Sequence, residues 1–210
     1  MSRKKVLAAA CAALFLWSCD VSINRSRHLA DGERSSGMTT VNGSIVIGAG
    51  CEVDGGCRTV NGRVAVGDGS RVEDLDTVNG SIVVGDDVTV DGDARTVNGS
   101  LKFGPGSKVS GGVSTVNGSI TLDNAVVSED VVTVNGDVRL REKSTVGGDI
   151  VIRNRGNVFS RIQSLDIRIE GGSVVEGGID VRDPDTRVRV YISKDSAVRG
   201  EIRNAEVIRE

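Results

Sequence analysis

The chain has 210 residues, a formal net charge of −3 and 28 glycines. Aromatic residues make up only 2% of it and a single histidine is present, a composition that argues against a globular enzyme with a wide core. Residues 39–140 hold 14 Asp and Glu against 7 Lys and Arg. This acidic excess excludes the basic surface that nucleic-acid binding requires.

Residues 1–18 have the pattern of a secretory signal peptide. Arg3, Lys4 and Lys5 form a basic start, and an apolar run of twelve residues follows at 6–17. Such a run is too short to span a bilayer comfortably and is typical of a signal. An ordinary cleaved signal and an uncleaved anchor are the alternatives to the lipoprotein signal described next.

The apolar run ends in Leu16-Trp17-Ser18-Cys19, which resembles the lipobox of bacterial lipoproteins, although Trp17 replaces the usual small residue. The resemblance implies that the thiol of Cys19 carries a diacyl group, such as palmitate chains, and that Cys19 is the mature N-terminus, anchored to a membrane. Asp20 resembles a sorting signal that retains lipoproteins at the inner membrane.

Residues 19–38 are interpreted as the lipidated Cys19 and a flexible tether. Residues 20–38 are rich in Ser, Arg, Asp and Gly and contain few apolar residues, so we expect no packed core there. His28 falls in this tether, and we expect it to be solvated and without a role.

The main feature of the chain is Thr-Val-Asn-Gly, which recurs at intervals of 18 or 19 residues and begins at Thr40, Thr59, Thr77, Thr96, Thr115 and Thr133. A fixed period of this size indicates a repeat architecture. Positions five and seven after each Thr are apolar and position six varies, which is the alternation of a half-buried strand. We therefore predict an all-β fold, a single-stranded β-solenoid (β-helix) with coils of about 18–19 residues, regular over 39–140 and divergent over 141–210.

The register of the repeat predicts which residues lie inside. We expect Ile82, Val84, Val90 and Val97 to be buried, and Val83 to lie on the outer face. Both residues of the Asn-Gly step tolerate positive φ, so we expect the step to form a tight corner. Stacking then gives an amide ladder with a structural role, comprising Asn42, Asn61, Asn79, Asn98, Asn117 and Asn135.

The divergent part is expected to form two to four further coils of the same solenoid. Thr145-Val146-Gly147 reads as a seventh copy of the repeat that arrives early. The stretch 171–181 recurs in weaker form at 195–202, and Val188, Val190 and Ile192 alternate with polar residues.

Residues for catalysis are missing from the repeats, so we expect no enzyme, no cofactor and no metal site. Residues 39–210 contain no histidine and no Gly-rich loop before a helix. Acidic corners such as 85–87 lack the nonapeptide that binds calcium in other solenoids. Cys51 and Cys57 are interpreted as buried free thiols in place of Val or Ala; a bridge between them, the alternative, needs a sharp bend at Gly55-Gly56.

Two resemblances bear on function. The stretches 85–93, 106–113 and 196–202 resemble bactofilins, which are polymer-forming cytoskeletal solenoids, and the repeated Thr-Val-Asn-Gly-Ser-Ile-Val-Val is similar to putative-adhesin solenoids of bacterial envelopes. The first implies a polymer-forming protein that self-associates through the solenoid ends. The second implies an envelope lipoprotein with a rigid scaffold or adhesion surface, facing the periplasm or exterior, whose protein or cell-wall partner stays open. A minor alternative is ice binding, based on an expected outward lattice of Thr and Asn side chains.

Overall fold

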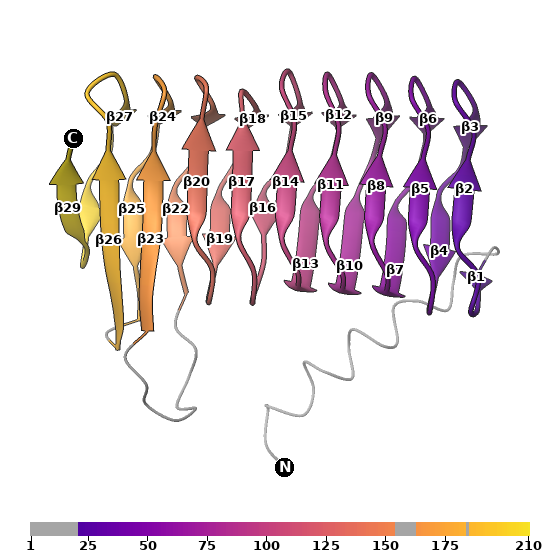
Figure 1. Ribbon diagram of the computed structural model, residues 1–210, viewed down its shortest axis with the longest axis horizontal. Coiled ribbons are helices and arrows are strands. Elements are labelled where there is room, and N and C mark those ends of the chain that lie inside the picture. The colour runs from indigo at the N-terminus through magenta and orange to yellow at the C-terminus, as the bar shows by residue number, and fades with distance from the viewer. Residues whose placement is uncertain (1–20, 154–162, 184) are drawn as a thin grey trace, which may run out of the picture.

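A computed structural model describes residues 21–153, 163–183 and 185–210. The expected all-β solenoid is confirmed: every strand pairing is parallel, and the strands form three sheets that run the length of a rod. Figure 1 shows the coils side by side, with the N-terminal coil at one end of the rod and the C-terminal coil at the other. No helix occurs in the described residues, and none there is long and apolar enough to cross a membrane.

Each complete coil contributes one strand to each sheet. The first sheet, sheet A, is β1 (Val21–Ser22), β4 (Met38–Thr40), β7 (Cys57–Asn61), β10 (Leu75–Asn79), β13 (Ala94–Asn98), β16 (Val113–Ser114), β19 (Val131–Thr133), β22 (Ile150–Ile152), β25 (Ile179–Val181) and β28 (Ile202–Arg203). Sheet B is β2 (Arg27–Leu29), β5 (Ile45–Ile47), β8 (Val64–Val66), β11 (Ile82–Val84), β14 (Leu101–Phe103), β17 (Ile120–Asp123), β20 (Val138–Arg141), β23 (Gln163–Ile169), β26 (Thr186–Ile192) and β29 (Glu206–Arg209). Sheet C is β3 (Arg34–Ser35), β6 (Glu52–Val53), β9 (Arg71–Val72), β12 (Thr89–Val90), β15 (Lys108–Val109), β18 (Val126–Val127), β21 (Thr145–Val146), β24 (Val174–Val175) and β27 (Ala197–Val198).

The core is a narrow column of aliphatic side chains. Ile82 and Val90 are fully buried and Val84 is 2% exposed, as the alternation predicts. Stacked coils place like residues next to each other, as in the pairing of Ile82 with Val64 on one side and with Leu101 on the other. Burial of such apolar surface drives the stacking, and each coil depends on its neighbours for it.

The corner between sheets B and C requires left-handed backbone. Gly69 has φ of 65° and Asp87, at the equivalent place one coil later, has φ of 54°. Glycine adopts this conformation without steric cost, and aspartate is among the few other residues that tolerate it. This explains the Gly-Asp-Gly and Gly-Asp-Asp sequences at 67–69 and 85–87.

The expected tether is wrong for residues 21–38, which form the first coil. Strands β1, β2 and β3 pair with β4, β5 and β6, and Leu29 and Met38 point into the core with exposures of 8% and 3%. This first coil packs against one neighbouring coil only. Pairing of its backbone with that coil and the burial of two apolar side chains are enough to order a segment of polar composition. His28 lies in β2 with its side chain exposed. The signal peptide, Cys19 and Asp20 fall outside the described residues.

The divergent residues form three coils, but their register differs from the expectation. Thr145 is wrong as a seventh repeat Thr, because β21 belongs to sheet C and pairs with β18 and β24. Ile152 instead occupies the place of the repeat threonine, opposite Thr133. The predicted match of 171–181 with 195–202 is confirmed in the pairing of Val174 with Ala197 and of Ile179 with Ile202.

Candidate interaction surface

The Thr-Val-Asn-Gly repeat lies at the C-terminal end of the regular strands of sheet A. The structure reverses the expected orientation of its first two residues. Thr59, Thr77 and Thr96 are buried at 0%, 5% and 4% exposure, whereas Val97 lies half-buried on the outer face. Residues two apart in a strand share a face, and Leu75 or Ala94, two residues before the repeat Thr, already points inward. The expectation that Val97 is buried is therefore wrong.

The buried repeat threonines from Thr40 to Thr115 are satisfied by the preceding coil, whereas the Oγ1 of Thr133 has no hydrogen-bond partner among the described residues. The satisfied hydroxyls donate to a main-chain carbonyl at the previous corner, with distances of 2.8 Å from Thr59 to Gly43 and 3.0 Å from Thr77 to Gly62. A buried hydroxyl without a partner would be costly. Because these threonines face inward, the outward lattice of Thr and Asn that suggested ice binding is absent from the described residues.

The asparagines stack along the corner and hydrogen-bond through their side-chain amides. The Nδ2 of Asn79 donates to the Oδ1 of Asn61 at 2.8 Å, and the Nδ2 of Asn98 donates to the Oδ1 of Asn79 at 2.8 Å. The ladder continues through Asn42, Asn117 and Asn135, and it begins one coil earlier than the repeat indicates, at Asn24. These bonds make the ladder an element of structure, and it ends at Asn135, whose Oδ1 has no hydrogen-bond partner among the described residues.

Glycine is required in the repeat for a physical reason other than the positive φ that the sequence suggested. Of the six repeat glycines only Gly118 has a positive φ, at 155°, and Gly62 and Gly99 do not. A Cβ on Gly99 would lie 2.0 Å from the carbonyl oxygen of Gly80, and a Cβ on Gly62 would lie 2.0 Å from that of Gly43. Stacked corners approach each other so closely that only glycine fits.

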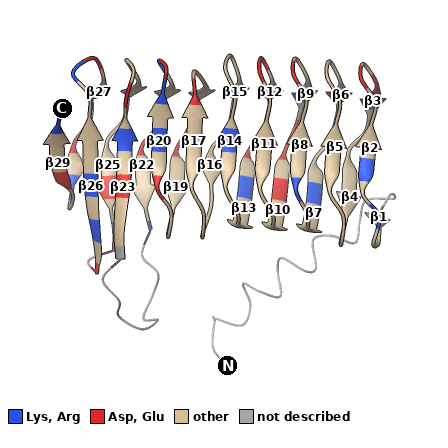
Figure 2. Cartoon of the chain, viewed as in Figure 1, with Lys and Arg blue, Asp and Glu red and all other residues tan. Residues whose placement is uncertain are grey.

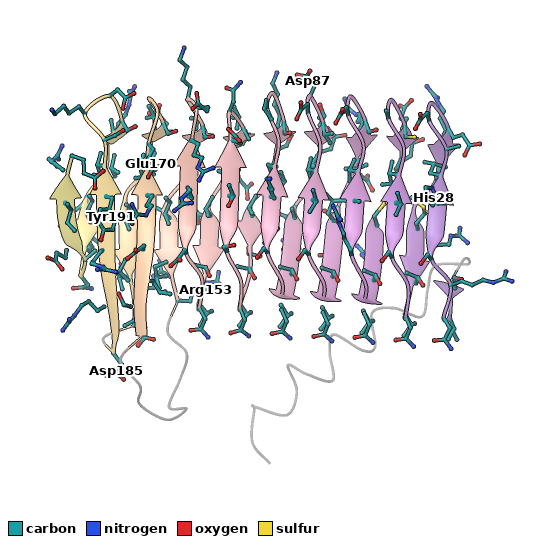
Figure 3. All side chains as sticks on the ribbon, in the orientation of Figure 1. His28, Asp87, Arg153, Glu170, Asp185 and Tyr191 are labelled. Atoms are coloured by element: carbon teal, nitrogen blue, oxygen red, sulfur yellow. The ribbon has the colours of Figure 1, made fainter. Side chains whose placement is uncertain are left out.

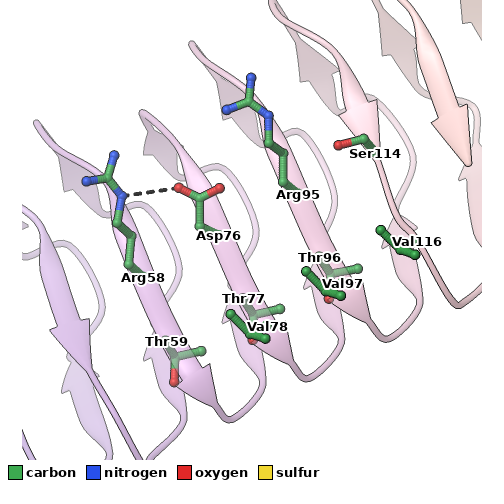
Figure 4. A pocket seen from close by; sticks show the side chains of 10 residues that line it. All are labelled: Arg58, Thr59, Asp76, Thr77, Val78, Arg95, Thr96, Val97, Ser114 and Val116. Atoms are coloured by element: carbon green, nitrogen blue, oxygen red, sulfur yellow. Dashed lines mark hydrogen bonds and ion pairs between the residues drawn. The ribbon is translucent and has the colours of Figure 1, made fainter. Parts of the chain in front are cut away.

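The outward valines form the floor of a shallow groove on sheet A. Val78, Val97 and Val116 lie on successive coils, and Val116 is 38% exposed. Figure 4 shows this row beside the row of Arg58, Asp76, Arg95 and Ser114, which projects from the same strands. The groove has a volume of about 470 Å³. The three valines give this face a narrow apolar strip with a spacing of one coil.

Charges border the groove in alternation, visible as the blue, red and blue bands of β7, β10 and β13 in Figure 2. The Nε of Arg58 lies 3.1 Å from the Oδ2 of Asp76, and its Nη2 lies 3.7 Å from Asp74. Arg95 pairs with Asp93. Burial raises the pKa of the Asp76 carboxyl above its ordinary value, and the hydrogen bond and charge of Arg58 oppose this rise. The groove thus offers an apolar strip with an ion-paired border.

Cys51 and Cys57 are free and buried, as interpreted from the sequence. Cys57 lies between Met38 and Leu75 in sheet A and so takes an apolar place. Cys51 takes the place of a serine: its Sγ donates to the Ala30 carbonyl at 3.0 Å, much as the Oγ of Ser70 donates to the Gly48 carbonyl at 2.9 Å. Both thiols belong to the core and not to the groove.

The fold places the protein in the class of parallel β-solenoids, here with a regular outer face. No protein-family model, curated protein sequence or solved structure matches the chain. No group of His, Cys, Asp and Glu able to hold a metal ion occurs in 21–153, 163–183 and 185–210.

Proposed function

We propose that this protein is a non-enzymatic envelope lipoprotein whose solenoid is a rigid scaffold that presents the sheet A groove to a protein partner. The outward-facing valine row, half-buried at Val78 and Val97 and exposed at Val116, carries this proposal. Val78, Val97 and Val116 have no role in the core, and aliphatic side chains on three successive coils form a continuous apolar strip. The ion-paired border of Arg58 and Asp76 gives the strip polar rims, as protein interfaces have.

The position of the first coil suits a membrane anchor. Strand β1 begins at Val21, so only Asp20 separates it from the proposed lipidated Cys19. A lipid on Cys19 would hold the first coil close to the membrane surface, with the rod extending roughly 45 Å from it at ~4.8 Å per coil. Two or more acyl chains give stable anchoring, whereas a single chain binds membranes only marginally.

The anchor is tested by metabolic labelling with a fatty acid, followed by cell fractionation. We expect the parent protein to incorporate the label and to sediment with membranes. Cys19→Ser should lose the label and leave a precursor with its signal still attached. An unlabelled parent protein would overturn the lipoprotein proposal.

The groove is tested by placing a photo-crosslinking residue at position 97 in intact cells. The matched control carries the same residue at Val46, which lies outward on sheet B. We expect a discrete crosslinked species of higher mass from position 97 alone. Equal products from both positions, or none from position 97, would contradict a role for the groove.

A second candidate is end-to-end assembly of the bactofilin type, which one observation favours. The C-terminal coil leaves Val198, Ile202 and Ala205 only partly buried, and Val207 is 42% exposed. Its strands β27, β28 and β29 each pair on one side only, and natural proteins normally cover such edges. Membrane attachment at the other end favours the scaffold, because it crowds the N-terminal coil.

A further inference from the structure

The outer face of sheet B changes character along the rod. The outward position at the centre of each strand is Val46, Ala65 and Val83 in β5, β8 and β11. In the five strands from β14 to β26 the same position holds Lys102, Thr121, Arg139, Arg168 and Tyr191. Figure 2 shows Lys and Arg on β14, β20, β23 and β26. Basic side chains therefore recur along one half of this sheet face, among acidic residues such as Asp137, Asp166 and Glu170.

Two arginines on this face are direct neighbours. Arg139 pairs in register with Arg168 on the adjacent strand, and like charges in this relation destabilise a sheet. Arg168 has partial compensation from Asp166 at 3.5 Å and Glu170 at 3.9 Å. Arg139 makes no ion pair with any residue that the structure describes. Among the described residues its guanidinium thus has no ion-pair partner, although Asp137 and Asp166 line the same hollow, and it can pair with an anionic ligand.

The surface beside these arginines is concave and polar. A hollow of about 300 Å³ lies over β17, β20 and β23, and Ser119, Thr121, Asp137, Arg139, Asp166 and Arg168 line it. Hydroxyl, carboxylate and guanidinium groups alternate there. Such a mixture forms hydrogen bonds with neighbouring hydroxyl groups, each of which both donates and accepts.

The groups of the hollow are held in place. The Oδ1 of Asp137 accepts from the main-chain N–H of Asp166 at 2.9 Å, and the Nε of Arg189 donates to Asp166 at 3.0 Å. The guanidinium of Arg168 stacks over the ring of Tyr191, 4.2 Å from its centroid. Figure 3 places Tyr191 and Glu170 on these C-terminal coils. Side chains fixed in advance lose less entropy when a ligand binds.

We propose that this part of sheet B, the arginine–tyrosine face of Arg139, Arg168, Arg189 and Tyr191, binds an acidic polysaccharide. A carboxylate of the sugar chain pairs with Arg139, and ring hydroxyls bond to Ser119, Thr121 and Asp137. Nucleic acid fits less well, because duplex DNA carries one charge per ~1.7 Å of its axis and Asp137, Asp166 and Glu170 would repel it. A polysaccharide with one carboxylate per sugar has sparser charge and many hydroxyl groups.

The test measures binding of an oligogalacturonate to the full chain in detergent at low ionic strength. A neutral malto-oligosaccharide and a duplex DNA of similar length serve as comparison ligands. We expect the oligogalacturonate to bind more tightly than either, with an affinity that falls as salt is added. Absence of binding, or tighter binding of the DNA, would overturn the proposal.

Variants locate the site. Arg139→Gln should weaken oligogalacturonate binding about tenfold or more, because it removes a charge-assisted hydrogen bond, whereas Arg139→Lys should retain most of the affinity. Arg63→Gln is the matched control, since Arg63 is exposed and directly precedes β8, which lies four strands from β20 along sheet B. An Arg139→Gln protein that binds like the parent would contradict the site, and so would an equal loss in Arg63→Gln, which would indicate diffuse charge attraction. Matching thermal unfolding of the variants shows that a loss is not due to misfolding.

Discussion

The hydroxyl of Thr96 donates a hydrogen bond of 2.9 Å to the carbonyl oxygen of Gly80 in the preceding coil. A Cβ on Gly99 would lie 2.0 Å from this same oxygen. One carbonyl therefore both satisfies the buried threonine of the repeat and excludes any side chain at the repeat glycine. Thr and Gly of the motif act as a pair across the stacked coils.

Gly99→Ala tests this relationship. The added methyl group collides with main chain, which cannot rotate away, so we expect a loss of about 2–4 kcal/mol in the free energy of unfolding. Gly56→Ala is the matched control, since its Cβ would meet the flexible Arg58 side chain at 3.2 Å. It should change stability by less than about 1 kcal/mol. Urea unfolding followed by circular dichroism measures both, and similar midpoints would contradict the close approach.

Val84→Asp tests the core register. The side chain is 2% exposed, so the substitution buries a carboxylate without a partner and should destabilise the protein by at least about 3 kcal/mol. Val83→Asp places the same group one residue away on the outer face and should cost less than about 1 kcal/mol. If the two variants melt together, the assignment of faces is wrong.

Cys57 makes stability depend on pH in the alkaline range. Burial raises the pKa of its thiol from 9.0 to about 12. Between these values the unfolded chain releases a proton that the folded chain keeps, so stability should fall as pH rises from about 9 to about 12. The slope from this group approaches about 1.4 kcal/mol per pH unit.

The difference between the parent and Cys57→Ala isolates this contribution. Alanine already occupies the equivalent place at Ala94, two coils away. The stability difference between the two proteins should be constant below pH 9 and change above it. A difference that stays constant up to pH 11 would show that the thiol titrates normally. Alkylation of Cys57 at pH 8 should likewise need unfolding, since the folded thiol is protonated and buried.

The last prediction concerns the assembly state of the protein. For a chain that starts at Asp20, and so lacks the signal and the lipid site, we expect electron microscopy to show mostly single rods. Val207→Lys adds a charge to the exposed C-terminal coil and should leave this result unchanged. Long uniform threads from the parent that disappear in Val207→Lys would instead support end-to-end polymerisation.

Much of this architecture follows from the sequence alone. The period of the repeat sets the coil length, and the alternation around Ile82 and Val84 identifies the inner face of sheet B, because successive side chains of a strand point to opposite sides. Identical asparagines at one period must stack, so the amide ladder also follows. These features depend on local geometry and on repetition.

Other features were decided only by the tertiary structure. The inward direction of Thr96 depends on the neighbouring carbonyl of Gly80, which satisfies its hydroxyl, and the motif alone does not show that partner. Residues 21–38 are ordered by pairing with the next coil, although their composition resembles a tether. Likewise, Arg139 and Arg168 are 29 residues apart in sequence and become neighbours only through the long connection before β23. Contacts between coils, and not the preference of any one segment, determine which residues meet.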